Sequence, residues 1–261
     1  MPTVIESVSK LYGRISQLES QRLADHPMER EITLRAIRKG LSSASASGTG
    51  PKRIADIGGG PGKIAFALAD EGHDVDLIDL TPELIRLAQT EQDQRRAAGN
   101  RPLLRSIAVG NALDKSALPE GAYDAVLLLG PLPDGGLVFV AFITIDAHLR
   151  DAAMRNPGKI VEFKEFYSKY LSDGRYEKFE PGQEKPTVQS FHTHPDDVRA
   201  FFAKHFADSL QLVELRSTEG ILGGGLDATL AKSSDEIVQA WADLLFESYS
   251  TKEQHLGFYM L

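Results

Sequence analysis

The residues with the clearest chemical meaning lie in a glycine-rich stretch. A short apolar run ends near Asp56, four glycines occupy positions 58–60 and 62, and a helical pattern begins at once. Glycine has no Cβ, so such a turn lets the backbone approach a ligand, and the N-terminus of the next helix offers free N–H groups. Asp79 ends the next apolar run, where a carboxylate can accept hydrogen bonds from both hydroxyls of a ribose. These residues predict a nucleoside-containing cofactor.

The spacing of the glycines separates two kinds of cofactor. In a dinucleotide fingerprint counted from Gly58, the third glycine would fall at position 63, which is Lys63. The stretch instead reads Asp56-x-Gly58-x-Gly60-x-Gly62. It resembles motif I of class I S-adenosylmethionine-dependent methyltransferases, whose ligand has a nucleoside and a charged amino acid tail but no pyrophosphate. A glycine turn without a ligand and an NAD or FAD site are the alternatives.

Later segments are similar to a group of small-molecule methyltransferases. The similar segments are "VGNALDKSALPEGAYDAVLLLGPL", "GGLVFVAF", "FHTHPDDVRAFF" and "HLGFYML". The resemblance implies S-adenosyl-L-methionine as cofactor and S-adenosyl-L-homocysteine as product. The cofactor contacts that it implies are Tyr12, Asp56, Gly58, Gly59, Gly60, Gly62, Asp79, Leu80, Asn111, Ala112, Leu129 and Gly130.

Asn111 departs from the family, which usually has an acid at this position. An amide carbonyl can still accept a hydrogen bond from the adenine amino group, although the charge is lost. The alternative is an ordinary turn residue.

Methyl transfer from a sulfonium is an in-line displacement, so a base is needed only where the acceptor loses a proton. The candidate bases are His192, His194, His26, His148 and His255. The resemblance favours His192 as base or substrate contact, with a helix-entry histidine bonded to backbone as the alternative.

The aromatic run of residues 163–170 has helical spacing and indicates packing. If it lines a pocket instead, an apolar or aromatic substrate follows. No set of ligands with metal-site spacing is found, so no metal is expected.

The elements that must position these residues alternate between strands and helices from residue 53 onward, which predicts a parallel sheet. The resemblance implies an α/β fold: a Rossmann-like, doubly wound, mostly parallel seven-stranded sheet with N-terminal helices and a mostly helical cap insertion. We expect one domain. Its parts are an N-terminal helical lid at 1–41, a linker at 42–52, the cofactor-binding core at 53–145, a cap and substrate region at 146–207, and C-terminal strands and a helix at 208–261.

The connection at residues 130–136 is short for two parallel strands, which normally need a dozen or more connecting residues. The family has a helix here. Three interpretations are open: a hairpin with an antiparallel fifth strand, a parallel pair joined by a strained strap or swapped between chains, or a segment missing from the sequence. We favour the parallel family topology, with the helix absent or unrecorded. A missing helix would expose apolar sheet surface, and a homodimer is one expected result.

The composition limits the classes of binding partner and of chemistry that are expected. The net charge of −8 argues against nucleic acid, and the absence of cysteine excludes disulfides and thiol catalysis. The sequence shows no signal peptide and no apolar run of membrane-spanning length, so we expect a cytoplasmic protein without a membrane partner.

The predicted function is methyl transfer to an oxygen, nitrogen or sulfur atom of a small molecule. One alternative is a methyltransferase-like protein that binds the cofactor as a binding module or cyclase-like enzyme. A second alternative is an NAD-dependent oxidoreductase.

Overall fold

The computed structural model describes residues 4–43, 50–99, 101–114, 122–127, 136–178, 186, 188–223, 225–248 and 259–260. The chain divides into two compact units. Unit 1 comprises Met1–Ala24 and Leu34–Val140, and unit 2 comprises Asp25–Thr33 and Ala141–Leu261. Each unit is described by itself below.

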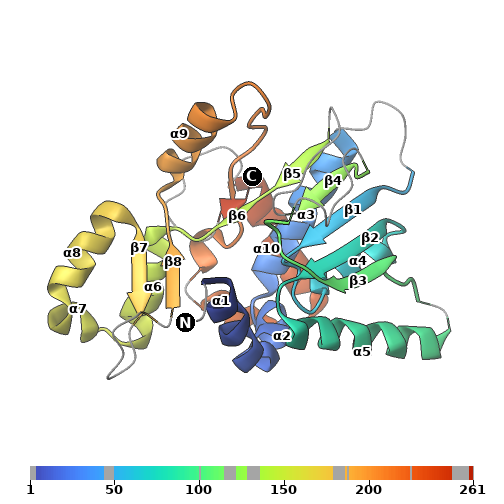
Figure 1. Ribbon diagram of the computed structural model, residues 1–261, viewed down its shortest axis with the longest axis horizontal. Helices are drawn as coiled ribbons and strands as arrows, with labels where there is room; N and C mark the ends of the chain where they lie inside the picture. Colours follow the sequence, from blue (N-terminus) through green and yellow to red (C-terminus); the bar gives the residue numbers. More distant parts are fainter. Residues whose placement is uncertain are drawn as a thin grey trace. The chain divides into compact units, whose positions relative to one another are not determined.

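A five-stranded sheet forms the centre of unit 1 (Figure 1). Its strands are β1 (Arg53–Ile57), β2 (Asp74–Asp79), β3 (Ser106–Val109), β4 (Ala125–Leu127) and β5 (Leu137–Phe139). The order is β3-β2-β1-β4-β5, and all neighbouring pairs are parallel. The order reverses at β1, and in open α/β sheets ligands bind at such a switch point, beyond the carboxyl ends of the strands.

The helices of unit 1 lie both before and after β1 in the sequence. They are α1 (Val4–Arg14), α2 (Ser16–Asp25), α4 (Lys63–Asp70) and α5 (Pro82–Ala98), and α3 (Pro27–Ser43) begins in unit 2 and continues into unit 1. Helix α2 ends at Asp25 and α3 begins at Pro27, and the helix predicted after the glycine loop is confirmed as α4. Thr81 occupies the N-cap position of α5, but its side chain makes no capping hydrogen bond.

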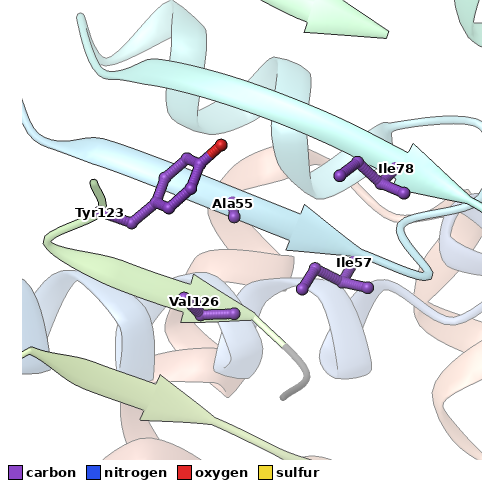
Figure 2. Close-up of a cluster of buried hydrophobic side chains, with 5 residues drawn as sticks. All are labelled: Ala55, Ile57, Ile78, Tyr123 and Val126. Atoms are coloured by element: carbon purple, nitrogen blue, oxygen red, sulfur yellow. The ribbon is translucent and has the colours of Figure 1, made fainter. Parts of the chain in front are cut away.

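The apolar sides of β1, β2 and β4 meet in a buried cluster. It contains Ala55 and Ile57 of β1, Ile78 of β2, Val126 of β4 and Tyr123, which lies just before β4 (Figure 2). Parallel strands are buried on both faces, so apolar residues dominate them, as in "AVL" of β4, which is buried throughout. This burial fixes the strand register that the site depends on.

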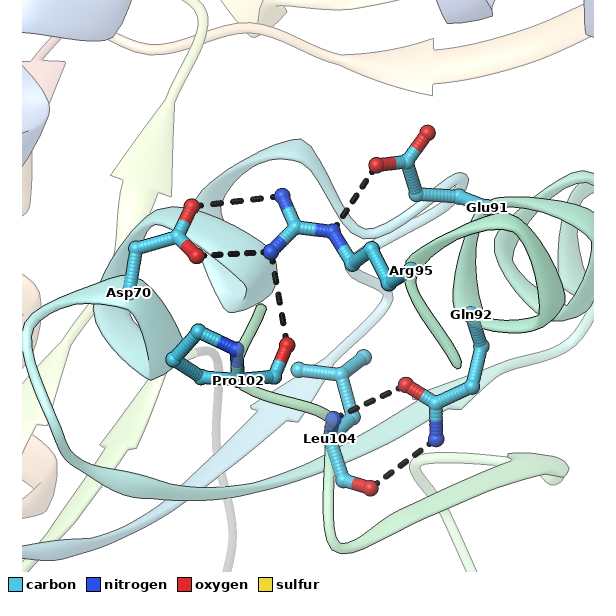
Figure 3. Close-up of polar contacts among 6 residues, drawn as sticks. All are labelled: Asp70, Glu91, Gln92, Arg95, Pro102 and Leu104. Carbon is cyan, nitrogen blue, oxygen red and sulfur yellow. Dashed lines mark hydrogen bonds and ion pairs between the residues drawn. The ribbon is translucent and has the colours of Figure 1, made fainter. Parts of the chain in front are cut away.

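Arg95 of α5 anchors the helices next to β2. Its guanidinium donates to both carboxylate oxygens of Asp70 at the end of α4, at 2.7 and 3.2 Å, and to Glu91 at 2.8 Å (Figure 3). One turn earlier, the side-chain amide of Gln92 exchanges two hydrogen bonds with the backbone of Leu104, which leads into β3. Together these bonds hold α5 against α4 and against the entry to β3.

Unit 2 has two small antiparallel sheets. One contains β6 (Ala141–Phe142), β10 (Tyr259–Met260) and β9 (Arg216–Ser217), in the order β6-β10-β9. The other pairs β7 (Arg175–Lys178) with β8 (Val188–Phe191). The α-helices described in this unit are α6 (Ile145–Arg155), α7 (Lys159–Glu162), α8 (Lys164–Asp173), α9 (Pro195–His205) and α10 (Asp235–Ser248), with 3₁₀ turns at Gly220–Leu222 and Asp227–Lys232.

The predicted strand count of seven is wrong, because the parallel sheet has five strands in the described part of the chain. The C-terminal segments expected to complete the sheet pair elsewhere: β9 and β10 join β6 in an antiparallel sheet. An apolar run indicates a strand but does not specify its partner, which depends on tertiary packing.

The hairpin interpretation of the short connection is also wrong. Strands β4 and β5 are parallel, with Ala125 opposite Leu137 and Leu127 opposite Phe139. The joining residues, 128–135, lie outside the described residues, and so do the predicted cofactor contacts Leu129 and Gly130. The favoured parallel pairing is therefore confirmed, while the state of the connection stays a prediction.

Candidate cofactor site

The glycine loop after β1 has a backbone that favours glycine at three positions. Gly58, Gly60 and Gly62 have φ angles of 76°, 58° and 79°, in the left-handed region that side chains rarely adopt. The N–H of Gly58 donates to the carbonyl of Ile78 in the adjacent strand at 2.7 Å, and Gly62 is the N-cap of α4. The loop therefore runs from the carboxyl end of β1 directly into a helix N-terminus.

Gly59 is required for a different reason. A Cβ built on it would overlap Oδ2 of Asp56 and come within 2.5 Å of Leu77 Cδ1. Asp56 and Leu77 lie opposite each other in the β1–β2 register, so their side chains share one face of the sheet. The loop thus packs its bare backbone on these two side chains.

Asp79 is joined to the glycine loop by hydrogen bonds. Its Oδ2 accepts from the N–H of Gly60 at 2.9 Å, and its Oδ1 accepts from the N–H of Thr81 at 2.7 Å. Each carboxylate oxygen has a second lone pair, so the carboxylate can still accept from two ligand hydroxyls. The structure therefore brings together the predicted loop and the predicted ribose acid.

Asp56 is the least satisfied polar group of this region. Its side chain is buried, and Oδ2 has no hydrogen-bond partner among the described residues. Burial raises the pKa of Asp56 to about 7, the charge of Asp79 acts in the same direction, and the backbone N–H of Ala65 opposes them. A buried, unpaired carboxyl beside a second acid is suited to a positively charged ligand group.

Tyr12 and Leu80 lie at the same edge of unit 1. Ser9 of α1 donates to the carbonyl of Leu80 at 3.4 Å, and Gly13 packs against Glu83 of α5. The pKa of the Tyr12 hydroxyl is raised by burial, by Glu19 and by the charge of Asp79. The first helix therefore carries Tyr12 to the neighbourhood of Asp79.

The turn after β3 holds the predicted adenine contacts. The N–H of Gly110 donates to the backbone carbonyl of Asp79 at 2.9 Å, which ties this turn to the same site. Oδ1 of Asn111 accepts from the N–H of Leu113 at 3.0 Å, as in a local turn, and Ala112 is exposed. The Asn111 carbonyl keeps one lone pair for a ligand.

His192 lies in unit 2, in a buried cluster of rings. Its Nδ1 is 2.6 Å from the Tyr170 hydroxyl, and its ring centroid is 4.6 Å from that of His148. Burial lowers the pKa of His192 to about 4, with His148 acting in the same direction, so the imidazole is neutral at physiological pH. Tyr167 and Tyr170 are buried with Ile145 in this unit, which favours the packing interpretation of the aromatic run.

The sequence indicates His26 as a candidate base but does not indicate its hydrogen-bond partner. In unit 2 its Nδ1 lies 3.0 Å from Oδ1 of the fully buried Asp227, 201 positions away. The hydrogen bond with the Asp227 side chain is the main cause of the raised pKa of His26. Glu219 lies in the same cluster: burial, then the charges of Glu29 and Asp227, raise its pKa to about 7, and Arg150 pairs with it at 3.0 Å.

Two negative findings concern the described residues only. Among them, no group of three or more His, Asp or Glu side chains is placed to hold a metal ion. None of the helices in the described ranges is long and apolar enough to cross a membrane.

The residues of unit 1 fit the cofactor that the resemblance implies. The bare backbone of the loop, the partly free acceptors of Asp79 and the unpaired oxygen of Asp56 match a ligand with ribose hydroxyls and positive charge.

Comparison with known proteins agrees with this fit. A family model described as a methyltransferase domain matches residues 55–132, well under half of the chain. No curated protein matches the chain.

Several solved structures are similar at low identity. A SAM-dependent methyltransferase from Methanosarcina mazei has a TM-score of 0.42 and 21% identity over 66% of this chain and 87% of that chain. Magnesium protoporphyrin IX methyltransferase from Synechocystis, with bound SAH, has a TM-score of 0.44 and 14% identity over 77% of this chain and 88% of that chain. At these values the similarities do not carry the assignment, which rests on the matched family model and on the glycine loop with its two acids. Residues 55–132 are therefore similar to a methyltransferase domain.

Proposed function

We propose that this protein transfers the methyl group of S-adenosylmethionine to an oxygen, nitrogen or sulfur atom of a small molecule. The observation that carries the proposal is the carboxylate of Asp79, held at the end of β2 by the N–H groups of Gly60 and Thr81. A carboxylate fixed beside a glycine loop at the switch point of a parallel sheet is arranged to bind the ribose of a nucleoside.

The chain's own residues would bind and orient the cofactor, which supplies an activated methyl group when bound. Asp79 would accept from the ribose hydroxyls, and the glycine loop would leave room for the amino acid tail. Leu80, Asn111, Ala112, Leu129 and Gly130 would contact the nucleoside, and Tyr12 would cover it from α1. Alignment and exclusion of water are the main requirements of this reaction, because the sulfonium is already a good leaving group.

For the acceptor we propose a small molecule that contacts residues 146–207. His192 is better suited to contact the substrate than to act as base, because a group with a pKa of about 4 is a weak proton acceptor at neutral pH. The pair of His26 and Asp227 has the geometry of an oriented base, with Nδ1 held by the carboxylate and Nε2 left to accept a proton.

Calorimetry with S-adenosylhomocysteine tests the cofactor part of the proposal. Gly60→Arg and Asp79→Ala are each expected to weaken binding by more than about tenfold, or ~1.4 kcal/mol. Gly50→Arg is the matched control for the first, since its Cβ would meet nothing within 4 Å. Asp74→Ala, at the opposite end of β2, is the control for the second. Wild-type protein that does not bind S-adenosylhomocysteine would contradict the proposal.

The short connection supports a second candidate, a protein that binds the cofactor without methyl transfer. Only residues 128–136 join two parallel strands, where the resembling family has a helix. Incubation with methyl-labelled cofactor and a metabolite extract separates the candidates: labelled small products support the transferase, and binding without products supports the second. Tighter binding of NADH than of S-adenosylhomocysteine would favour an oxidoreductase over both.

A further inference from the structure

Asp56 forms no ion pair among the described residues. The side chain is 5% exposed, Oδ2 has no hydrogen-bond partner, and no ion pair of the described residues includes this carboxyl. An ionised carboxylate in such a place is costly, and a buried acid without a partner avoids the cost by keeping its proton.

The groups around Asp56 increase this preference. From β2, Asp79 contributes a second carboxyl and Leu77 an apolar surface against the same face of the sheet. From α4, the backbone N–H of Ala65 is the one favourable group, and Lys63, the first residue of that helix, is exposed to solvent. From the loop, the backbone of Gly59 packs on Oδ2. With a second carboxyl beside it and a single backbone N–H in its favour, Asp56 is disposed to keep its proton.

Asp79 is the better hydrogen-bonded acid of the pair. Both of its oxygens accept backbone N–H bonds, which favour the charged form of a carboxylate. Asp56, whose Oδ2 has no hydrogen-bond partner among the described residues, is the less compensated acid of the pair.

We infer that Asp56 is a proton-linked part of the cofactor site: it is protonated in the free protein and releases its proton to solvent when the positively charged cofactor binds. This inference rests on the proposed function. S-adenosylmethionine carries a sulfonium and an ammonium group, and a nearby positive charge favours the ionised carboxylate. The site would then bind cofactor more tightly as the pH rises through neutrality.

The size of the effect follows from linkage. With a pKa of about 7 in the free protein and a much lower value in the complex, affinity at pH 8 exceeds affinity at pH 6 by about tenfold. The cofactor's own α-amino group titrates at a pKa of about 7.7–8.0. For this reason the difference between wild type and an Asp56→Asn variant, rather than the raw pH profile, measures the contribution of Asp56.

The experiment is calorimetry of S-adenosylmethionine binding at pH 6.5 in two buffers of different ionisation enthalpy, together with dissociation constants from pH 6 to 8. Wild type is expected to release about three quarters of a proton per site at pH 6.5, which is the protonated fraction of a group with a pKa of about 7. Asp56→Asn is expected to abolish this release and to flatten the pH profile. Asp74→Asn removes a charge from the far end of β2 and is expected to behave as wild type.

The outcomes distinguish this inference from the proposed function. Binding with equal proton exchange in wild type and Asp56→Asn would overturn the inference and leave the proposed function standing. Absence of binding to wild type across the pH range would overturn both. If Asp56→Asn does not fold, carbon-13 NMR of the wild-type Asp56 carboxyl decides the question: a midpoint near pH 7 that falls by at least about one pH unit on addition of cofactor supports the inference, and an unchanged midpoint overturns it.

Discussion

The backbone N–H of Gly60 donates to Oδ2 of Asp79 at 2.9 Å, which joins the glycine loop to the acid 19 positions later in the sequence. The bond exists because Ile57 pairs with Ile78 in the parallel register, so that β1 and β2 end at the same edge of the sheet. A loop and an acid that are separate signals in the sequence thus form one cofactor site.

Gly59→Ala should damage the site through sterics alone. The added Cβ would overlap Oδ2 of Asp56 and crowd Leu77, and neither β1 nor β2 can move without disturbing the sheet. We expect a loss of about 1–3 kcal/mol in unfolding free energy, as for overpacked cores, with weaker binding of S-adenosylhomocysteine. Urea denaturation and calorimetry measure the two effects. Gly50→Ala, whose Cβ would meet nothing within 4 Å, serves as control, and a Gly59→Ala protein as stable as this control would refute the steric argument.

Asp56→Asn should stabilise the protein at alkaline pH. In the unfolded chain the carboxyl ionises near its ordinary pKa of 3.8, whereas in the folded protein the pKa is about 7. The folded state therefore binds more protons between these values, so the stability of wild type falls as the pH rises through this window. The shift corresponds to at most about 4 kcal/mol. Urea denaturation measures the unfolding free energies at pH 5 and pH 8. The unfolding free energy of Asp56→Asn relative to wild type should be higher at pH 8 than at pH 5, and parallel changes in the two proteins would contradict the raised pKa of Asp56.

Arg95→Ala should cost more stability than truncation of its neighbour. Arg95 donates to Asp70 and Glu91 and lies over the ring of Phe66 at 4.5 Å, with its side chain only 8% exposed. Its removal leaves polar groups without partners, and we expect a loss of about 2–3 kcal/mol. The exposed Arg96, which pairs with Asp93, is the matched control, with an expected loss below about 1 kcal/mol. Similar unfolding free energies for the two variants would show that the network contributes little.

Asp227→Asn should lower the pKa of His26. The hydrogen bond from Nδ1 to the buried carboxylate is the main cause of the raised pKa, so its stabilising effect is complete below pH 6.5 and is lost as the pH rises through the raised value. NMR titration of the His26 ring protons measures the change. Asp208→Asn, at an exposed site in the same unit, should leave the titration unaltered. A His26 pKa that does not respond to Asp227→Asn would show that the pair does not exist in solution.

The sequence by itself determined the features that depend on neighbouring residues. Glycines at 58–60 and 62 predicted a loop that only glycine can form, and three of the φ angles lie in the left-handed region. The helical pattern after the glycines predicted α4, and the apolar runs predicted the strands that flank the loop. Each of these follows from local backbone sterics or from burial of a single segment, which the sequence states directly.

Only the tertiary structure decided which segments pair and which charges meet. Strand β6 follows β5 after a single residue but pairs with β10 rather than extending the parallel sheet, and His26 lies within hydrogen-bond distance of Asp227 across 201 positions. The environment of Asp56 is likewise a consequence of folding, because its pKa depends on the burial of β1 and on the register that places Asp79 beside it. Pairing and burial are properties of the whole packed chain, so no local pattern could specify them.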